Sequence, residues 1–157
     1  MGQEKERKFE LLYVPTELLS ELHKEEIEQG YLMFDGAKHL RIRIITLDNQ
    51  MLRQIGMLGF KTVKSDEEKD EFEFRIPIEE AIELMASTKI KVNKTRYKTT
   101  FQGNSVDIDI FPNGISWVEI EFEKPFTELP KFCGREITGS KEFNNIAIAF
   151  KNANEKH

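Results

Sequence analysis

Ionisable side chains stand at every second position in the stretch "EKERKF", residues 4 to 9. Glu4, Glu6 and Lys8 occupy alternate places in it. On a β-strand, alternate side chains point to the same face, so these three would form one line of charge. That line is either the solvated outer face of a sheet or part of a charged interior, and the rest of the chain has to decide between the two.

The same alternation recurs along the chain in stretches of opposite charge. Arg41 and Arg43 alternate with apolar residues in "LRIRII", Lys94 and Arg96 do so in "KVNKTRYK", and glutamates do so in "VEIEFE" at 118–123. One such strand would most simply have a wet polar face, because antiparallel sheets often face water on one side. Outer faces also contain Thr, Ser and Gln, however, whereas nearly every polar position here is ionisable. The set as a whole therefore favours a charged interior.

A charged interior carries chemical consequences. Buried charges are costly unless they are paired or hold a ligand. A lumen lined with Arg and Lys would bind a multiply charged anion such as a polyphosphate. Clustered carboxylates without His or Cys are hard oxygen ligands, which suit Mg²⁺ or Mn²⁺. Together these features predict a metal-dependent site for phosphate chains.

The elements that would position these side chains are mainly strands. Period-two alternation predicts about eight of them, at 4–10, 40–45, 59–64, 71–76, 91–98, 106–111, 118–123 and, more briefly, near 135–138. Apolar spacing predicts helices over 16–29 and 77–85, residues 141–150 could form a helix or a closing strand, and 65–71 is expected to be a solvated hairpin loop. We therefore expect a mainly β, α+β fold: a closed, antiparallel, eight-stranded β-barrel with a charged lumen and helices packed outside.

Composition limits the remaining possibilities. The 157 residues are expected to form one domain, 1–157, and twelve Phe argue against disorder. The net charge of -5 gives no general attraction to nucleic acid or anionic lipid, and no apolar run is long enough to cross a bilayer. The charged N-terminal stretch is unlike a signal peptide, and Cys133 is the only cysteine. We expect a cytoplasmic protein whose partner is a small molecule rather than DNA or a membrane.

The ordered motifs resemble those of the CYTH family, the triphosphate tunnel metalloenzymes. Its ExExK signature is similar to Glu4, Glu6 and Lys8, and the resemblance continues in order over nearly the whole chain. The further matching segments are "IEQGYL" at 27–32, the R-x-R of 41–43, "TVKS" ending at 65, "EFE" at 71–73, the K-x-R of 94–96, "DIF" at 109–111, the E-x-E of 119–121 and "GREIT" at 134–138.

The resemblance implies a tunnel that grips a triphosphate in its middle. Basic residues would contact the phosphates: Lys8, Arg41, Arg43, Lys64, Lys94, Arg96 and Arg135. Acidic residues would hold Mg²⁺ or Mn²⁺: Glu4, Glu6, Glu119 and Glu121. Glu71, Glu73 and Asp109 are further expected lumen residues, and Lys8 and Glu6 are the expected catalytic pair.

The leading hypothesis is hydrolysis of a terminal phosphoanhydride, with inorganic tripolyphosphate as the substrate. A class IV-type adenylyl cyclase, a thiamine triphosphatase, an enzyme acting on RNA 5′-triphosphate ends and a non-catalytic polyphosphate or nucleotide binder stay open as alternatives. The histidine-phenylalanine pair that precedes ExExK in many class IV cyclases is missing, since only Met1, Gly2 and Gln3 come before Glu4. The chain also departs from the family pattern at Lys69 and at 143–145. Oligomeric state stays open, with a homodimer among the expectations.

Overall fold

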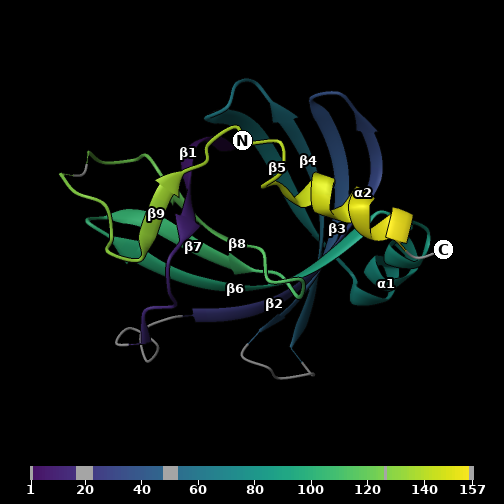
Figure 1. Cartoon of the computed structure of the whole chain (residues 1–157). Helices are drawn as coiled ribbons and strands as arrows, with labels where there is room; N and C mark the ends of the chain where they lie inside the picture. Colours follow the sequence, from purple (N-terminus) through teal and green to yellow (C-terminus); the bar gives the residue numbers. More distant parts are fainter. Residues whose placement is uncertain (1, 17–22, 48–52, 126, 156–157) are drawn as a thin grey trace.

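A computed structural model describes residues 2–16, 23–47, 53–125 and 127–155, with side chains from residue 5 onward (Figure 1). Its strands are β1 (Gly2–Leu11), β2 (His23–Asp35), β3 (Lys38–Leu47), β4 (Gln54–Val63), β5 (Glu68–Ile76), β6 (Lys91–Phe101), β7 (Asn104–Ile110), β8 (Ser116–Glu121) and β9 (Cys133–Glu136). Its helices are α1 (Ile78–Ala86) and α2 (Asn145–Glu155).

The strands close into a barrel. Their order is β5-β4-β3-β2-β6-β7-β8-β1, and β1 also pairs with β5, so eight antiparallel strands form a ring. β1 closes the ring because it changes its partner strand along its length. In the strand register, Glu4 lies opposite Lys69 of β5, whereas Glu6 lies opposite Glu121 of β8. The predicted eight-stranded barrel is confirmed, but its membership differs, because the ring includes β2 and the short strand β9 is added beside β1.

The helix predicted over 16–29 is wrong where the structure describes that stretch. Residues 23–29 belong to β2, and 17–22, with the leucines that suggested a helix, lie outside the described residues. β2 is hydrogen-bonded to β3 on one side and β6 on the other, and this tertiary pairing overrides the helical preference of its glutamates. Gly30, expected to stop the helix, instead lies under α1, where an added Cβ would sit 2.9 Å from Met85 Sδ.

The expected loop at 65–71 is shorter than predicted. Residues 64–67 connect β4 to β5, so only 65–67 of the expected loop lie between strands, because β5 begins at Glu68. The alternation of "EFEFRI" therefore extends backwards to Lys69, which lies on the same face as Glu71. This shift adds a cation to the interior wall of the barrel.

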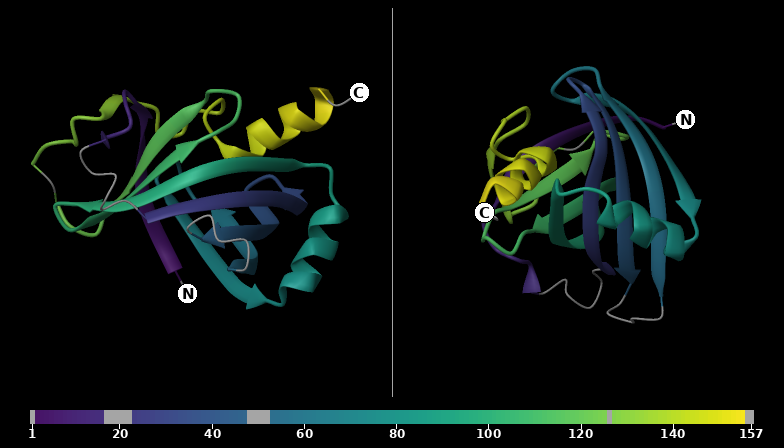
Figure 2. Two further views of the ribbon diagram at one scale, coloured as in Figure 1. Left: turned by 90° about the horizontal axis from the view of Figure 1, so that it is seen from below. Right: turned by 90° about the vertical axis from the view of Figure 1, so that its right-hand side faces the viewer.

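The two helices cover different parts of the barrel (Figures 1 and 2). α1 follows its predicted position and packs Ala81 and Met85 on the outer side of β3, against Ile42 and Ile44, although Ile82 is exposed. The segment 141–150 contains the start of α2, so the helical alternative is correct. The α2 residues Ile148 and Ala149 pack with Tyr31, Val92 and Trp117, whose strand positions face inward, so α2 covers one end of the barrel.

Apolar residues cover the outer side of the opposite wall. Phe9, Ile108, Val118 and Ile120 form a buried cluster with Phe132 from the segment before β9. The alternate positions of β1, β7 and β8 therefore point their ionisable side chains inward. No helix in the described part of the chain is long and apolar enough to cross a membrane.

Candidate active site

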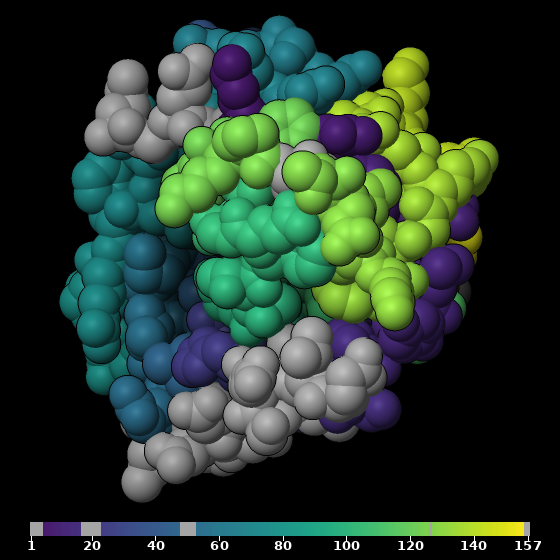
Figure 3. Space-filling model, turned by 90° about the vertical axis from the view of Figure 1, so that its left-hand side faces the viewer, coloured from purple at the N-terminus to yellow at the C-terminus, as the bar shows by residue number. Residues whose placement is uncertain are grey.

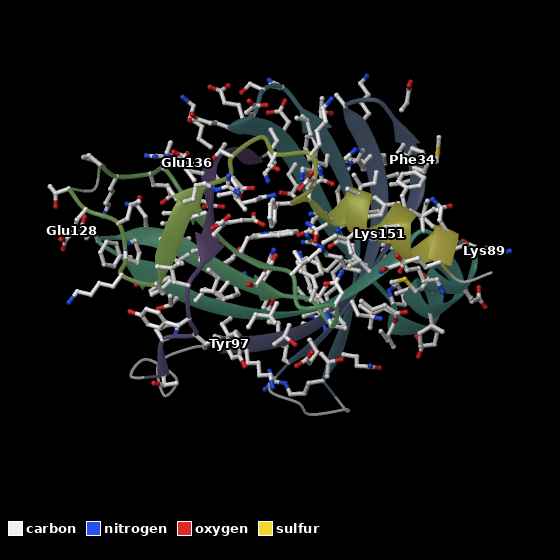
Figure 4. The ribbon with its side chains drawn as sticks, viewed as in Figure 1. Phe34, Lys89, Tyr97, Glu128, Glu136 and Lys151 are labelled. Atoms are coloured by element: carbon white, nitrogen blue, oxygen red, sulfur yellow. The ribbon has the colours of Figure 1, made fainter. Side chains whose placement is uncertain are left out.

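The barrel interior encloses a cavity of about 630 Å³ whose lining is mainly ionisable. Its cations include Lys8, Arg41, Arg43, Lys61, Lys69 and Arg96, and its carboxylates include Glu6, Glu71, Glu73, Asp107, Glu119 and Glu121. In Figure 4 the blue and red tips of side chains crowd the space that the strands enclose, and in Figure 3 the surface is hollowed between the blue-teal and green parts of the chain. Charges of both signs therefore share one cavity inside the barrel.

Two arginines of β3 form one cationic wall. Arg41 is 3% exposed and Arg43 is 8% exposed, and both point inward beside carboxylates of β5. Arg41 forms an ion pair with Glu71, and Arg43 Nη1 lies 3.3 Å from Glu73 Oε2. Burial, followed by repulsion from Arg43, lowers the pKa of Arg41 to about 9. Among the described residues, Arg41 Nε has no hydrogen-bond partner, so this buried N–H can still donate to an anionic oxygen.

Two lysines add charge from the neighbouring strands. Lys61 of β4 lines the cavity, and burial, followed by Lys69 and Arg41, lowers its pKa well below the ordinary value. Lys69 of β5 lies against Glu6 of β1. The mutual repulsion of these cations would be relieved by a multiply charged anion between them.

Arg96 is held in place from behind by a buried carboxylate. Asp109 accepts hydrogen bonds from Arg96 Nε at 2.7 Å, Arg96 Nη2 at 2.9 Å and Lys94 Nζ at 3.0 Å. Lys94 also donates to Asn145 Oδ1 of α2 at 2.9 Å. Burial alone would raise the pKa of Asp109, but Arg96 and Lys94 outweigh it and lower the pKa. The network fixes the guanidinium of Arg96 at the cavity wall.

The carboxylates of β1 and β8 meet on the opposite wall. Glu6 is the cross-strand partner of Glu121, and its carboxyl also contacts that of Glu119. Burial, followed by the charge of Glu119, raises the pKa of Glu6 to about 7. Burial would raise the pKa of Glu119 as well, but Lys8 and Lys69 outweigh it and hold that pKa well below the ordinary value. Of the two carboxyls, Glu6 is therefore the one that takes up a proton more readily, which relieves their mutual repulsion.

These carboxylates fit the metal that the resemblance implies. Adjacent carboxylate oxygens are the ligands that hard divalent cations prefer, and a cation between Glu6 and Glu119 would cancel their repulsion. Glu4 belongs to the same face of β1 by register, but its side chain lies outside the described residues. Among the described side chains, no three His, Cys, Asp or Glu residues already form a metal-binding group. A metal would thus draw together carboxylates that the strands bring to one wall.

Lys8 connects the carboxylate wall to the end that α2 covers. Its Nζ donates to the Phe143 carbonyl at 2.6 Å and lies 4.5 Å from the centre of the Trp117 ring. The Trp117 indole Nε1 donates to Glu119 Oε1 at 2.8 Å. Lys8 is therefore held at the cavity wall next to the candidate metal ligands.

Comparison with known proteins identifies the family. The model of the CYTH domain family matches residues 2–148. The chain belongs to the CYTH domain family. It is 31% identical to the inorganic triphosphatase of Acetivibrio thermocellus over 99% of this chain and all of that protein.

Solved structures share the CYTH fold of this chain. The PH1819 protein of Pyrococcus horikoshii has a TM-score of 0.59 at 23% identity, covering 80% of this chain and 79% of the other. A conserved hypothetical protein of Pyrococcus furiosus has a TM-score of 0.57 at 23% identity, covering 96% and 90%. A Hippeastrum protein, described as a candidate adenylyl cyclase with a dominant triphosphatase activity, has a TM-score of 0.55 at 16% identity, covering 78% and 80%. Likeness at these identities concerns the fold.

The barrel brings together most of the residues expected from the CYTH motifs. The expected cations that line the cavity are Lys8, Arg41, Arg43 and Arg96, and the expected carboxylates that line it are Glu6, Glu71, Glu73, Glu119 and Glu121. Asp109 is also an inward-facing residue, but it lies behind Arg96 and is fully buried. The three hydrogen bonds that Asp109 accepts from Arg96 and Lys94 give it a structural role.

Three basic residues expected at the phosphates are placed elsewhere. Lys64 follows the end of β4 and pairs with Asp70 at 2.9 Å, while Lys61, three residues earlier, faces the cavity. Lys94 faces inward but is buried between Asp109 and Asn145. Arg135 of β9 pairs with Glu10 at 2.8 Å on the outer surface and is 72% exposed, because β9 lies outside the ring.

Sequence reasoning missed several lining residues. Lys61 could have been found by running the alternation of "GFKTVK" from its first lysine, and Lys69 by extending that of "EFEFRI" backwards. Tyr31 and His39 also line the cavity, with their rings edge to face at 5.8 Å. His39 could have been found by extending the alternation of "LRIRII" backwards, because it lies two residues before Arg41 on the same face of β3.

Proposed function

We propose that this CYTH protein is a divalent-metal-dependent triphosphatase that hydrolyses the terminal phosphoanhydride bond of inorganic tripolyphosphate. The observation that carries the proposal is a cavity inside the barrel in which the buried arginines Arg41, Arg43 and Arg96 face a carboxylate pair. Burying several guanidinium groups together is costly, and the cost falls when a multiply charged anion lies among them. The identity to an inorganic triphosphatase over almost the full chain adds support.

The phosphate chain binds among the cations of β3, β4, β5 and β6. The oxygen of a water molecule forms a bond to the terminal phosphorus as the bond to the bridging oxygen breaks, which gives orthophosphate and pyrophosphate. Glu6 orients the water and accepts its proton. Arg41 and Arg43 stabilise the charge that gathers on the transferred phosphoryl oxygens, and Lys8 stabilises the charge on the leaving pyrophosphate.

The metal completes this arrangement. A bound Mg²⁺ or Mn²⁺ would supply charge neutralisation at the phosphate oxygens and help to align water with phosphorus. Glu4, Glu6, Glu119 and Glu121 are its proposed ligands, from two neighbouring strands of one wall. The lysines and arginines across the cavity bind the phosphate oxygens that the metal leaves free.

A substrate panel tests the proposal. The protein is incubated with tripolyphosphate, ATP, thiamine triphosphate and an RNA 5′-triphosphate, each with Mg²⁺, with Mn²⁺ and with EDTA, and the products are separated by ion chromatography. We expect orthophosphate and pyrophosphate from tripolyphosphate with metal and none with EDTA. Cyclic AMP from ATP would overturn hydrolysis in favour of cyclase chemistry, and tight binding without turnover would favour a non-catalytic binder.

A matched pair of variants tests the cationic wall. Arg41→Gln should reduce the rate on the order of 100-fold, as loss of a fixed charge-stabilising donor does in other enzymes. Arg135→Gln should stay within about twofold of the wild type, because that side chain lies on the outer surface. Glu121→Gln should weaken activation by Mg²⁺, measured as a higher metal concentration at half-maximal rate. Equal losses in Arg41→Gln and Arg135→Gln would contradict the assignment of the site to the cavity.

A further inference from the structure

His39 is a half-buried imidazole on the cationic wall of the cavity. It lies two residues before Arg41 on the same face of β3, and its cross-strand partner on β4 is Lys61, which also lines the cavity. On the side of β2, its ring meets the ring of Tyr31 edge to face, with the centroids 5.8 Å apart. The imidazole is therefore placed beside two cations and one neutral aromatic ring.

The cations beside His39 disfavour its protonated form. Burial, followed by the charges of Lys61 and Arg41, lowers the pKa of His39 below its ordinary value of 6.5. Glu71 and Glu73 of β5 do not offset these charges, because they pair with the two arginines of β3. At neutral pH the imidazole is therefore largely neutral. The other ionisable residues that line the cavity on this side are Lys69 of β5, Asp66 and Glu67 of the β4–β5 connection and Lys141 before α2.

One hydrogen bond determines where the neutral ring keeps its proton. His39 forms this bond with the backbone of Gly36, and the bond favours the protonated form of the imidazole. A bond with that effect is donated by the ring, so the acceptor is the Gly36 carbonyl oxygen. A neutral imidazole has one N–H, which this bond uses, so the second ring nitrogen carries a lone pair. Within the described part of the chain, that second nitrogen makes no hydrogen bond.

A phosphate oxygen and the lone pair of the second nitrogen are both acceptors, so they repel each other until the ring takes up a proton. The negative charges of a phosphate chain act on His39 in the opposite direction to Lys61 and Arg41, and they would raise its pKa. Uptake of a proton from solvent turns the second nitrogen into a charged donor, which forms a stronger hydrogen bond than a neutral one. Binding of the anion and protonation of the ring therefore favour each other.

We propose that His39 is a substrate-binding residue that takes up a proton from solvent as a phosphate chain enters the cavity and then donates from its second nitrogen to a phosphate oxygen. Gly36 and Ala37, which connect β2 to β3, line the cavity together with His39, so this contact lies at the end of the cavity near that connection. The assignment rests on the proposed function insofar as the ligand is a phosphate chain. It adds a pH-dependent cation to the arginines of β3.

Proton uptake on binding is the first test. Tripolyphosphate is titrated into the protein by calorimetry in EDTA at about pH 6.5, in two buffers that differ in enthalpy of ionisation. His39→Gln, which cannot be protonated, should take up fewer protons than the wild type, by up to about one per chain. Protons exchanged by other groups, or by tripolyphosphate itself, cancel in this difference. His23→Gln is the matched control: His23 is exposed at the start of β2 and is not among the residues that line the cavity, so its uptake should equal that of the wild type.

The pH dependence of affinity is the second test. The imidazolium contributes only below the pKa that His39 has in the complex, so the cost of losing it should grow as pH falls. The Kd of His39→Gln should exceed that of the wild type about 10-fold at roughly pH 5.5 and less than about twofold at roughly pH 9. His39→Arg carries its charge at both pH values, so it should bind more tightly than His39→Gln by a similar factor at each.

The outcomes separate this inference from the proposed function. Equal proton uptake by the wild type and His39→Gln, or a ratio of their Kd values that stays constant with pH, would overturn the role of His39. If the wild type still cleaves tripolyphosphate in that case, the hydrolase stands. Wild-type protein that binds tripolyphosphate without cleaving it would refute hydrolysis, while a difference in proton uptake would still support the contact. Absence of any tripolyphosphate binding by the wild type would refute both.

Discussion

Replacing Asp109 by Asn should lower the free energy of unfolding by about 3–5 kcal/mol, the range found when one partner of a buried ion pair is removed. Asp109 is fully buried and accepts three charge-assisted hydrogen bonds from Arg96 and Lys94. An amide of the same shape keeps one acceptor oxygen and turns an NH₂ group toward the cations. For a chain of this length, the loss corresponds to a fall in Tm of roughly 6–20 °C.

Lys94 should account for less of this energy than Arg96. Burial, followed by repulsion from Arg96, lowers the pKa of Lys94 to about 7, so it can shed its proton at little cost when Asp109 is lost. Lys94→Met should therefore destabilise the fold by less than about 2 kcal/mol. The double variant with Asp109→Asn should lose less than the sum of the two single variants, because the two residues share one network.

The pH dependence of stability should follow the same groups. The pKa of Asp109 is lowered in the fold, so its stabilisation is present above pH 3.8 and is lost as pH falls through the folded value. The difference between the wild type and Asp109→Asn should therefore narrow in acid. The pKa of Lys94 falls from 10.5 to about 7, so the unfolded chain binds more protons between those values. Its contribution to wild-type stability should rise with pH across that window, and Lys94→Met should lack this rise.

Urea unfolding gives the measurement. Trp117 is the single tryptophan and is fully buried, so its fluorescence reports loss of the barrel core, with circular dichroism as a second probe. Glu10→Gln is the control: its ion pair with Arg135 is exposed, and its loss should change stability by at most about 1 kcal/mol. An Asp109→Asn variant within 1 kcal/mol of the wild type, or a Glu10→Gln variant equally damaged, would refute the reasoning.

Three further predictions concern the wall, the cysteine and the outer packing. Lys61→Gln should slow tripolyphosphate hydrolysis on the order of 100-fold, because Lys61 lines the cavity. Lys64→Gln should stay within about twofold of the wild type in the same phosphate-release assay, because Lys64 pairs with Asp70. Equal losses of rate would contradict the placement of Lys61, and not Lys64, in the cavity. At pH 8, Cys133 should react with iodoacetamide about 100-fold more slowly than an unperturbed thiol, because burial raises its pKa from 9.0 to about 11; mass spectrometry against a model thiol measures this, and equal rates would contradict it. Gly56→Ala should destabilise by about 1–3 kcal/mol in urea, since the new Cβ would lie 2.6 Å from the Cβ of Ala81. Adding Ala81→Gly should recover part of that loss, and no recovery would show that the clash lies elsewhere.

The faces of most strands could be predicted from the sequence. Glu6 and Lys8, Arg41 and Arg43, and Glu119 and Glu121 all lie inward, because side chains alternate on any strand. The residues between the two arginines and between the last two glutamates, Ile42 and Ile120, are apolar. The barrel followed from the same pattern, since only a closed sheet lets so many charged faces point to one interior. Strand β2 could not be predicted, because its glutamates do not alternate regularly with apolar residues. Its conformation is imposed by hydrogen bonds to the neighbouring strands β3 and β6.

The sequence by itself determined which residue types line the interior and therefore that a polyanion and a divalent cation suit it. Only the tertiary structure decided which of these side chains line the same cavity. Strand register selects Lys61 over Lys64, the position of β9 outside the ring puts Arg135 on the surface, and burial beside Asp109 withdraws Lys94 from the cavity. The physical reason is that alternation specifies a face, whereas hydrogen-bonded pairing between distant strands specifies the height along the tunnel and the partner across it.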